Sequence, residues 1–171
     1  MKAKVEQGLN EQIHAEFFSF YLYLSVSAFF TKLHLDGFAH WMRIQAQEEF
    51  AHAMKLFDYL NERGATVQLL ALDAPQSEWS SPSAAVEAVL KHEQHISERI
   101  NRLVDLSNSE NDHATTVLLH WFVNEQVEEE ATADTLYHQV KMVESNPHGL
   151  LMIDRELAGR PAAAPIDAAE A

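Results

Sequence analysis

The sequence predicts an all-α fold, a four-helix bundle with one long crossover between helices two and three and a short fifth helix at the C-terminal end. Three observations predict this fold. Gly and Pro number only five each among 171 residues, and strand-type alternation is hard to find. Four long stretches carry apolar residues at helical spacing. Two short turns and one long connection separate those stretches.

The first two helices are predicted as a hairpin. The first runs from about Val5 to His34, and the second from about Asp36 to Arg63. Asp36 is a residue type that caps helix N-termini, and Gly64 is a stop signal. The turn between them is short, so these helices should lie antiparallel.

The third helix follows a connection without helical periodicity. Residues 64–81 contain Pro75 and a Ser cluster. Ser81-Pro82 then offers an N-cap followed by Pro at the first helical position, and the helix should run to about Asn108.

The fourth helix should begin at Asn111 or Asp112 and end near Ser145, because Asn146-Pro147 breaks the pattern. Residues 148–157 are predicted as the short fifth helix. We expect residues 1–158 to form one domain. The Ala/Pro-rich residues 159–171 are expected to be a flexible tail.

The length of the connection determines the predicted topology. A helix of about 28 residues is roughly 42 Å long, and the connection at 64–81 can span roughly 60 Å when extended. It can therefore run the full length of the bundle and make the second and third helices parallel.

Composition excludes several classes of protein. The chain has no Cys, which excludes disulfides and thiolate metal sites. Its N-terminus, MKAKVEQGLNEQ, lacks the apolar region of a signal peptide, and no stretch approaches the ~18 apolar residues of a membrane span. A cytoplasmic protein without membrane contact is therefore expected. The net charge of −14 argues against nucleic acid as a partner; it fits either attraction of cations or simple solubility.

Polar residues interrupt the apolar stripe of each long helix. Glu49 and His52 lie three residues apart on one face, where core residues should be. The other helices carry Glu16, Glu93 and Glu129 at comparable positions. The stripe of the second helix reads Phe38, Met42, Gln45, Glu49, His52, Leu56 and Tyr59.

These five polar residues should lie in one layer. Glu16 is about 20 residues from a turn near residue 36, and Glu49 and His52 are about 13 and 16 residues from that turn. In the second hairpin, Glu93 and Glu129 are about 17 and 19 residues from a turn near residue 110. The axial mismatch within each hairpin is below roughly 11 Å. All four helices can therefore contribute to a single central layer.

Four carboxylates in an apolar bundle repel one another and lose hydration, at a cost of several kcal/mol per ion. Lys and Arg are absent from the stripes. Either the acids are protonated or a bound cation compensates them. Two divalent metals would balance four carboxylates and would give His52 the role of a nitrogen ligand. The oxygen-rich set suits iron or Mn²⁺ better than Cu or structural Zn, although Zn²⁺ could also occupy it.

Four motifs in order carry a family resemblance. They are NEQIHAEFFSFYLY (10–23), AQEEFAHAMKLFDYL (46–60), KHEQHI (91–96) and HWFVNEQVEEE (120–130). Over nearly all of residues 1–158 the chain resembles ferritins of the bacterial non-haem type, which are ferritin-like di-iron carboxylate proteins.

The resemblance implies a ferroxidase centre with two irons per subunit. Glu16, Glu49 and His52 resemble the ligands of one iron. Glu49 would bridge to a second iron held by Glu93 and Glu129.

Further residues are implied near this centre. Glu48, Glu125 and Glu128 resemble a third iron site that shares Glu129, or else form a solvated helix face. Gln126 either touches a metal or its bound oxygen, or is a core amide that hydrogen-bonds to Glu129 or to a water. Tyr23 is either a candidate electron donor or simply a buried aromatic residue.

Two departures separate the chain from bacterioferritins. The fourth helix has Gln126-x-x-Glu129 where a symmetric di-iron site has Glu-x-x-His. Phe50 stands where bacterioferritins have the haem-binding Met, so no haem is expected.

The resemblance implies iron storage. Fe²⁺ would be oxidised by O₂ or H₂O₂, and Fe³⁺ stored as an oxyhydroxide mineral inside a cage of 24 identical subunits. Alternatives are a di-iron oxidase or peroxidase that stores no iron, and a non-catalytic acidic scaffold. Subunit contacts are also expected because several apolar residues lie off the core stripes: Phe17, Phe18, Leu22, Leu24, Val26, Phe29 and Trp41.

Overall fold

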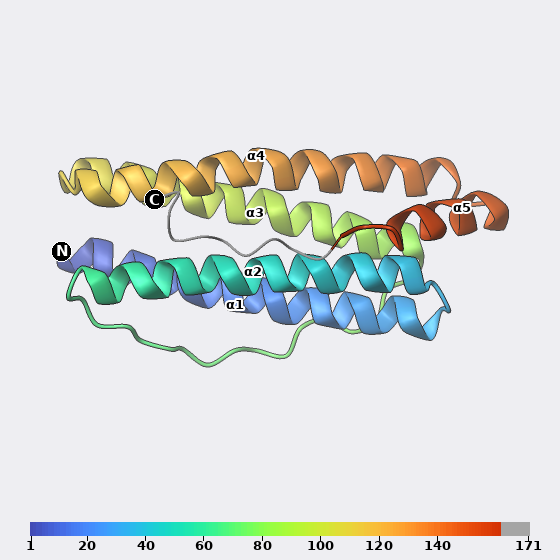
Figure 1. The fold of residues 1–171 in the computed structure, drawn as a ribbon, viewed down its shortest axis with the longest axis horizontal. Coiled ribbons are helices and arrows are strands. Elements are labelled where there is room, and N and C mark those ends of the chain that lie inside the picture. The colour runs from blue at the N-terminus through green and yellow to red at the C-terminus, as the bar shows by residue number, and fades with distance from the viewer. Residues whose placement is uncertain (162–171) are drawn as a thin grey trace.

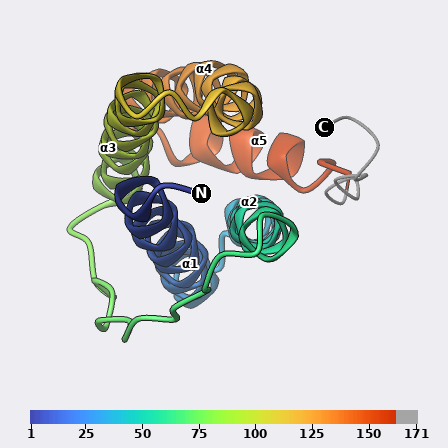
Figure 2. The same ribbon diagram turned by 90° about the vertical axis from the view of Figure 1, so that its left-hand side faces the viewer.

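The computed structural model describes residues 1–161 and contains five helices and no strand within them. They are α1 (Ala3–Lys32), α2 (Asp36–Glu62), α3 (Pro82–Ser109), α4 (His113–Met142) and α5 (Pro147–Leu157). The four long helices lie side by side along one axis, and α5 packs at one end against α2 and α4 (Figure 1). The end-on view in Figure 2 shows the four long helices around a common centre. The predicted all-α bundle with a crossover and a fifth helix is confirmed.

Most predicted helix boundaries agree with the structure to within a few residues. The Ser81 hydroxyl accepts a hydrogen bond from the Ala84 amide at 3.1 Å and starts α3. The Asp112 carboxylate accepts from the Thr115 amide at 3.3 Å and starts α4. Gly64 follows α2 with a φ of +65°, a conformation that glycine adopts without strain.

The start of α2 differs from the prediction. Asp36 is already helical, and no side chain from this segment caps the helix. Asp154 of α5 supplies the carboxylate instead, accepting from the amides of Gly37 at 2.8 Å and Phe38 at 3.0 Å. A Cβ at residue 37 would lie 1.7 Å from the Asp154 carbonyl oxygen, so this approach requires glycine. The cap comes from about 117 positions along the chain, beyond the reach of a local sequence pattern.

The crossover between α2 and α3 runs along α1 from one end to the other (Figure 1). Four contacts follow in order: the Gln68 amide to Asn10 Oδ1 at 2.6 Å, His14 Nε2 to the Ala71 carbonyl at 3.0 Å, the Ser25 hydroxyl to the Gln76 carbonyl at 2.7 Å, and Lys32 Nζ to Glu78 at 2.9 Å. Residues 64–81 thus traverse the whole bundle. The parallel arrangement of α2 and α3 is confirmed.

The apolar core consists of two clusters. The first core cluster includes Leu9, Ile13, Leu56, Ile96, Ile100, Leu119 and Phe122. The second core cluster includes Tyr23, Phe30, Phe38, Met42, Val86, Val89, Leu136 and Val140. The sequence positions that separate the two clusters on each helix are those of the buried polar residues. The acids therefore lie inside the bundle with packed apolar side chains on both sides.

Two expectations need correction. Leu22, Val26, Phe29 and Trp41 are buried within a single chain, so they are no evidence for subunit contacts. One 18-residue window of α1 has a mean hydropathy of 1.2, which is sufficient for a membrane span by length and composition, contrary to expectation. Because 56% of that window is buried within the protein, its apolar residues serve the bundle core.

Candidate metal centre

The acids and the imidazole of the predicted site form a carboxylate layer, defined here as Glu16, Glu49, His52, Glu93 and Glu129. Ligand atoms of Glu16, Glu49 and His52 all lie within 4.8 Å of one another. His52 Nδ1 is 3.7 Å from Glu49 Oε2. Helix α1 thus supplies one carboxylate, and one turn of α2 supplies a carboxylate and an imidazole nitrogen.

Helices α3 and α4 contribute Glu93 and Glu129, each held by hydrogen-bond donors. Glu93 accepts from the Tyr23 hydroxyl and, at 3.2 Å, from Gln126 Nε2. Glu129 accepts from Gln45 Nε2 at 2.6 Å. Both carboxylates are buried, and both lie close enough to Glu49 for their charges to raise its pKa.

The layer is acidic and short of positive charge. Burial is the main cause that raises the pKa of Glu93 to about 7 and that of Glu129 to about 7. Burial, followed by the charges of Glu93 and Glu16, also raises the pKa of Glu49. Within residues 1–161, no Lys or Arg nitrogen lies within 4 Å of these four carboxylates.

Two carboxylate oxygens in this layer lack hydrogen bonds. Glu16 Oε2 and Glu49 Oε1 are buried and have no hydrogen-bond partner among residues 1–161. An unpaired buried carboxylate oxygen is costly unless a proton or a cation satisfies it. Their proximity to an imidazole nitrogen gives a donor set that fits divalent cations such as Fe²⁺.

The residues of the predicted third site are only partly brought together. Glu125 joins His52 and Glu129 in a second group whose ligand atoms lie within 4.8 Å of one another. Glu48 and Glu128 are outside that group, although the charges of both raise the pKa of Glu125, after burial as the main cause. Glu128 is exposed. The third site remains a prediction.

Gln126 and Tyr23 both act as donors to Glu93. Gln126 Nε2 also lies 3.3 Å from the Glu93 carbonyl oxygen and 3.2 Å from the Ser97 hydroxyl. Tyr23 is fully buried, and that burial raises the pKa of its phenol, so it stays protonated near neutral pH. Gln126 thus donates to Glu93 and Ser97 of α3, whereas the core-amide alternative expected a hydrogen bond with Glu129 or a water. The Tyr23 hydroxyl lies against a candidate iron ligand.

Two glutamines were missed by sequence reasoning. Gln12 Nε2 donates to Glu16 Oε1 at 2.8 Å, and Gln45 makes the contact with Glu129 described above. Gln12 lies four residues before Glu16, and Gln45 lies four residues before Glu49. Each glutamine therefore shares a helix face with the acid that follows it. The available signal was a glutamine one helical turn before Glu16 and another one turn before Glu49.

Comparison with known proteins gives a consistent picture. The ferritin family model, described as a ferritin-like domain, matches residues 6–143. A bacterial non-haem ferritin from Bacteroides fragilis strain 638R is 41% identical over 157 residues, covering 92% of this chain and 98% of that protein. One from Staphylococcus saprophyticus is 38% identical over 153 residues, covering 90% and 92%.

Solved structures agree. An open pore ferritin from the hyperthermophilic archaeon Archaeoglobus fulgidus aligns with a TM-score of 0.93 and 45% identity, covering 94% of this chain and 98% of that one. An engineered closed form of the Archaeoglobus fulgidus ferritin aligns with a TM-score of 0.94, also at 45% identity, covering 95% and 99%. This chain therefore belongs to the ferritin family, and its resemblance to the bacterial non-haem type is confirmed.

Proposed function

We propose that this ferritin oxidises Fe²⁺ at the carboxylate layer and stores the Fe³⁺ product as an oxyhydroxide mineral inside a cage of 24 subunits. The observation that carries this proposal is the pair of orphaned oxygens on Glu16 and Glu49. They lie in a buried layer of four acids and one imidazole, and among residues 1–161 no Lys or Arg nitrogen lies within 4 Å of these carboxylates. Family membership supports iron storage and ferroxidase activity in general.

The residues divide between two Fe²⁺ positions. Glu16, Glu49 and His52 hold one ion, and Glu93 and Glu129 hold the second, with Glu49 bridging the two. Anionic oxygen ligands stabilise Fe³⁺ more than Fe²⁺, which favours oxidation. Glu48, Glu125 and Glu128 are proposed to bind a third iron, for which Glu125 is the best placed.

The electron balance explains why two ions bind together. Each Fe²⁺ gives up one electron, so two ions reduce one O₂ with two protons to H₂O₂, and no radical is released. H₂O₂ can oxidise two further Fe²⁺ with two protons, giving two waters. Each Fe³⁺ then reacts with two waters to form FeO(OH) and three protons. The hydrogen bond from Tyr23 to Glu93 supports a role for that phenol as a candidate electron donor.

Exposed leucines on the crossover support assembly into a homo-oligomer. Leu69 is 67% exposed, Leu70 49% and Leu72 40% in the isolated chain. Large apolar side chains that stay exposed within one short segment are typical of an interface. The net charge of −14 favours the attraction of Fe²⁺ to the assembled protein.

Aerobic Fe²⁺ titration in a stopped-flow instrument tests the proposal. The wild type should show a fast oxidation phase, which Glu49→Ala and His52→Ala each remove. Glu62→Ala, an exposed acid on the same helix, is the matched control and should leave that phase unchanged. Normal rates in both site variants would overturn the assignment.

Size-exclusion chromatography after loading tests storage. Iron should co-elute with a particle many times larger than the 19.4 kDa subunit. A protein that oxidises iron but elutes free of it would instead be an oxidase or peroxidase without storage.

A further inference from the structure

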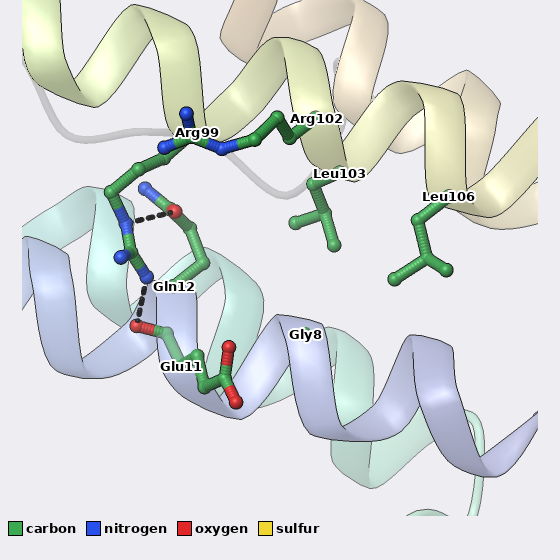
Figure 3. Close-up of a pocket in the computed structure, with 7 residues that line it drawn as sticks. All are labelled: Gly8, Glu11, Gln12, Arg99, Arg102, Leu103 and Leu106. Carbon is green, nitrogen blue, oxygen red and sulfur yellow. Dashed lines mark hydrogen bonds between the residues drawn. The ribbon is translucent and has the colours of Figure 1, made fainter.

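A chain of hydrogen bonds connects the surface of the bundle to Glu16. Arg99 of α3 donates through Nε to Gln12 Oε1 at 3.2 Å, and Gln12 Nε2 donates to Glu16 Oε1 at 2.8 Å. Figure 3 shows Arg99 reaching across the groove between α3 and α1 to Gln12. Glu16 therefore has one oxygen held by an amide, while its other oxygen is the orphan.

A second chain of the same kind reaches Glu129 from another direction. Arg160, just beyond α5, donates through Nη1 to Gln45 Oε1, and Gln45 Nε2 donates to Glu129 Oε2 at 2.6 Å. The order arginine, glutamine, carboxylate is the same as at Glu16. The two chains share no residue and involve different helices.

The orientation of each amide is fixed from both ends, by the arginine and by the carboxylate. A glutamine amide has an acceptor oxygen and a donor nitrogen, and turning it by half a rotation exchanges them. Arginine has only donors, so the amide oxygen must face the guanidinium and the NH₂ group must face the carboxylate. Gln12 and Gln45 are each only 1% exposed, so water does not compete for these contacts.

We propose that Arg99 and Arg160 are positioning residues which, through Gln12 and Gln45, orient Glu16 and Glu129 for iron binding. This inference rests on the function proposed above. Without the arginine, only the carboxylate would hold the amide, which could then turn away and leave that carboxylate oxygen without its donor. With the arginine, one oxygen of each carboxylate is held and the other is left for the metal.

Both guanidinium groups are fixed independently of the glutamines. Arg99 Nη2 donates to the Glu11 carbonyl at 2.8 Å, within a cavity of about 230 Å³ that Gly8 and Leu103 also line (Figure 3). This anchoring contact is made to the backbone, so it does not depend on the orientation of the Gln12 amide.

Arg160 is anchored by three contacts with α2. It makes a double contact with the Glu48 carboxylate at 2.8 and 3.1 Å, and it lies 4.9 Å from the centre of the Trp41 ring. Its carbonyl oxygen accepts from His40 Nε2 at 2.9 Å.

Charge alone predicts the opposite effect from positioning. A guanidinium near a cation site repels the cation, so removing it should tighten metal binding. Loss of positioning should weaken it instead. The sign of the change therefore separates the two explanations.

Anaerobic titration with Co²⁺, monitored by the visible absorption of the bound ion, measures metal affinity without any oxidation step. Arg99→Met should weaken Co²⁺ binding by about tenfold, the lower range for loss of an outer-shell contact to a metal ligand. Arg102→Met removes the same charge from an exposed position on the same helix, and it should bind Co²⁺ as tightly as the wild type or more tightly. Arg99→Lys keeps a donor and should recover most of the affinity.

A double-mutant cycle tests whether Arg99 acts through Gln12. Gln12→Leu should weaken Co²⁺ binding, and adding Arg99→Met should cause no further loss. Additive losses would overturn the proposal, as would an Arg99→Met variant that binds Co²⁺ at least as tightly as the wild type.

Arg160→Met is an independent arm and decides the question if Arg99→Met does not fold. It removes a positive charge and leaves Glu48 unpaired, so charge alone predicts tighter binding. Weaker binding supports positioning, and unchanged or tighter binding overturns it. A wild type that takes up no Co²⁺ at the buried layer would refute the proposed function itself, a result distinct from any of these.

Discussion

Replacing Glu129 by Gln should stabilise the metal-free protein at alkaline pH. The folded-state pKa of Glu129 is about 7, raised from 4.5 mainly by burial and next by the charge of Glu93. A raised carboxyl pKa means that the folded state binds a proton more tightly than the unfolded state. The stabilising contribution is therefore fully present below pH 4.5 and is lost as the pH rises through about 7. A glutamine does not titrate, so its contribution to stability does not change over this pH range.

The magnitude follows from the size of the shift. The difference between 4.5 and about 7 corresponds to about 3 kcal/mol, at roughly 1.4 kcal/mol for each pKa unit. For a domain of this length, about 3 kcal/mol moves the melting temperature by roughly 6–12 °C. We expect a gain of that order for Glu129→Gln at about pH 8 and almost none near pH 4.5.

Differential scanning calorimetry in the presence of a chelator measures the melting temperatures of the wild type and the variant at both pH values. Glu128→Gln, on the same helix but exposed, is the matched control and should show no such pH-dependent gain. The reasoning fails if Glu129→Gln melts at or below the wild-type temperature at about pH 8, or if its advantage is the same at both pH values. The same substitution should weaken Co²⁺ binding, because it removes a charged ligand.

Three further predictions follow from other contacts. Tyr23→Phe removes a hydrogen bond that lowers the pKa of Glu93, so Co²⁺ uptake should shift to higher pH when titrated across a pH series. Asp154→Ala removes the cap of α2 and should lower the free energy of unfolding by about 1 kcal/mol, measured by denaturant titration in chelator. The Trp121 ring lies 5.4 Å from the His52 ring, so Co²⁺ binding should quench its fluorescence, and Trp121→Phe should abolish most of that response.

The carboxylate layer was predictable because it depends on periodicity and length. Residues three or four apart share a helix face, which places Glu49 and His52 together. Counting from a hairpin turn gives the axial height of each residue, and the length of the crossover determines which helices run parallel. These quantities are local, or add along the chain, so a single sequence contains them.

Contacts across the bundle were not predictable in the same way. Gln45 shares a helix face with Glu49, yet its amide donates to Glu129 on another helix. Its direction depends on a rotamer and on the position of Arg160, which lies in the tail predicted as flexible. Residues 162–171 of that tail lie outside the described part of the chain. Helical periodicity identifies a face but not the partner that the side chain meets there.

The acids also link iron uptake to the stability of the subunit. Ionisation of Glu129 costs the metal-free fold about 3 kcal/mol, because burial raises the pKa of its carboxyl from 4.5 to about 7. A metal ion at a hundred times its dissociation constant stabilises the fold by about 2.7 kcal/mol per site. These magnitudes are comparable, so binding of Fe²⁺ offsets a destabilisation that the packing of the two core clusters otherwise compensates. Above pH 7 the loaded subunit should therefore be the more stable state, and release of iron should leave the layer either protonated or strained.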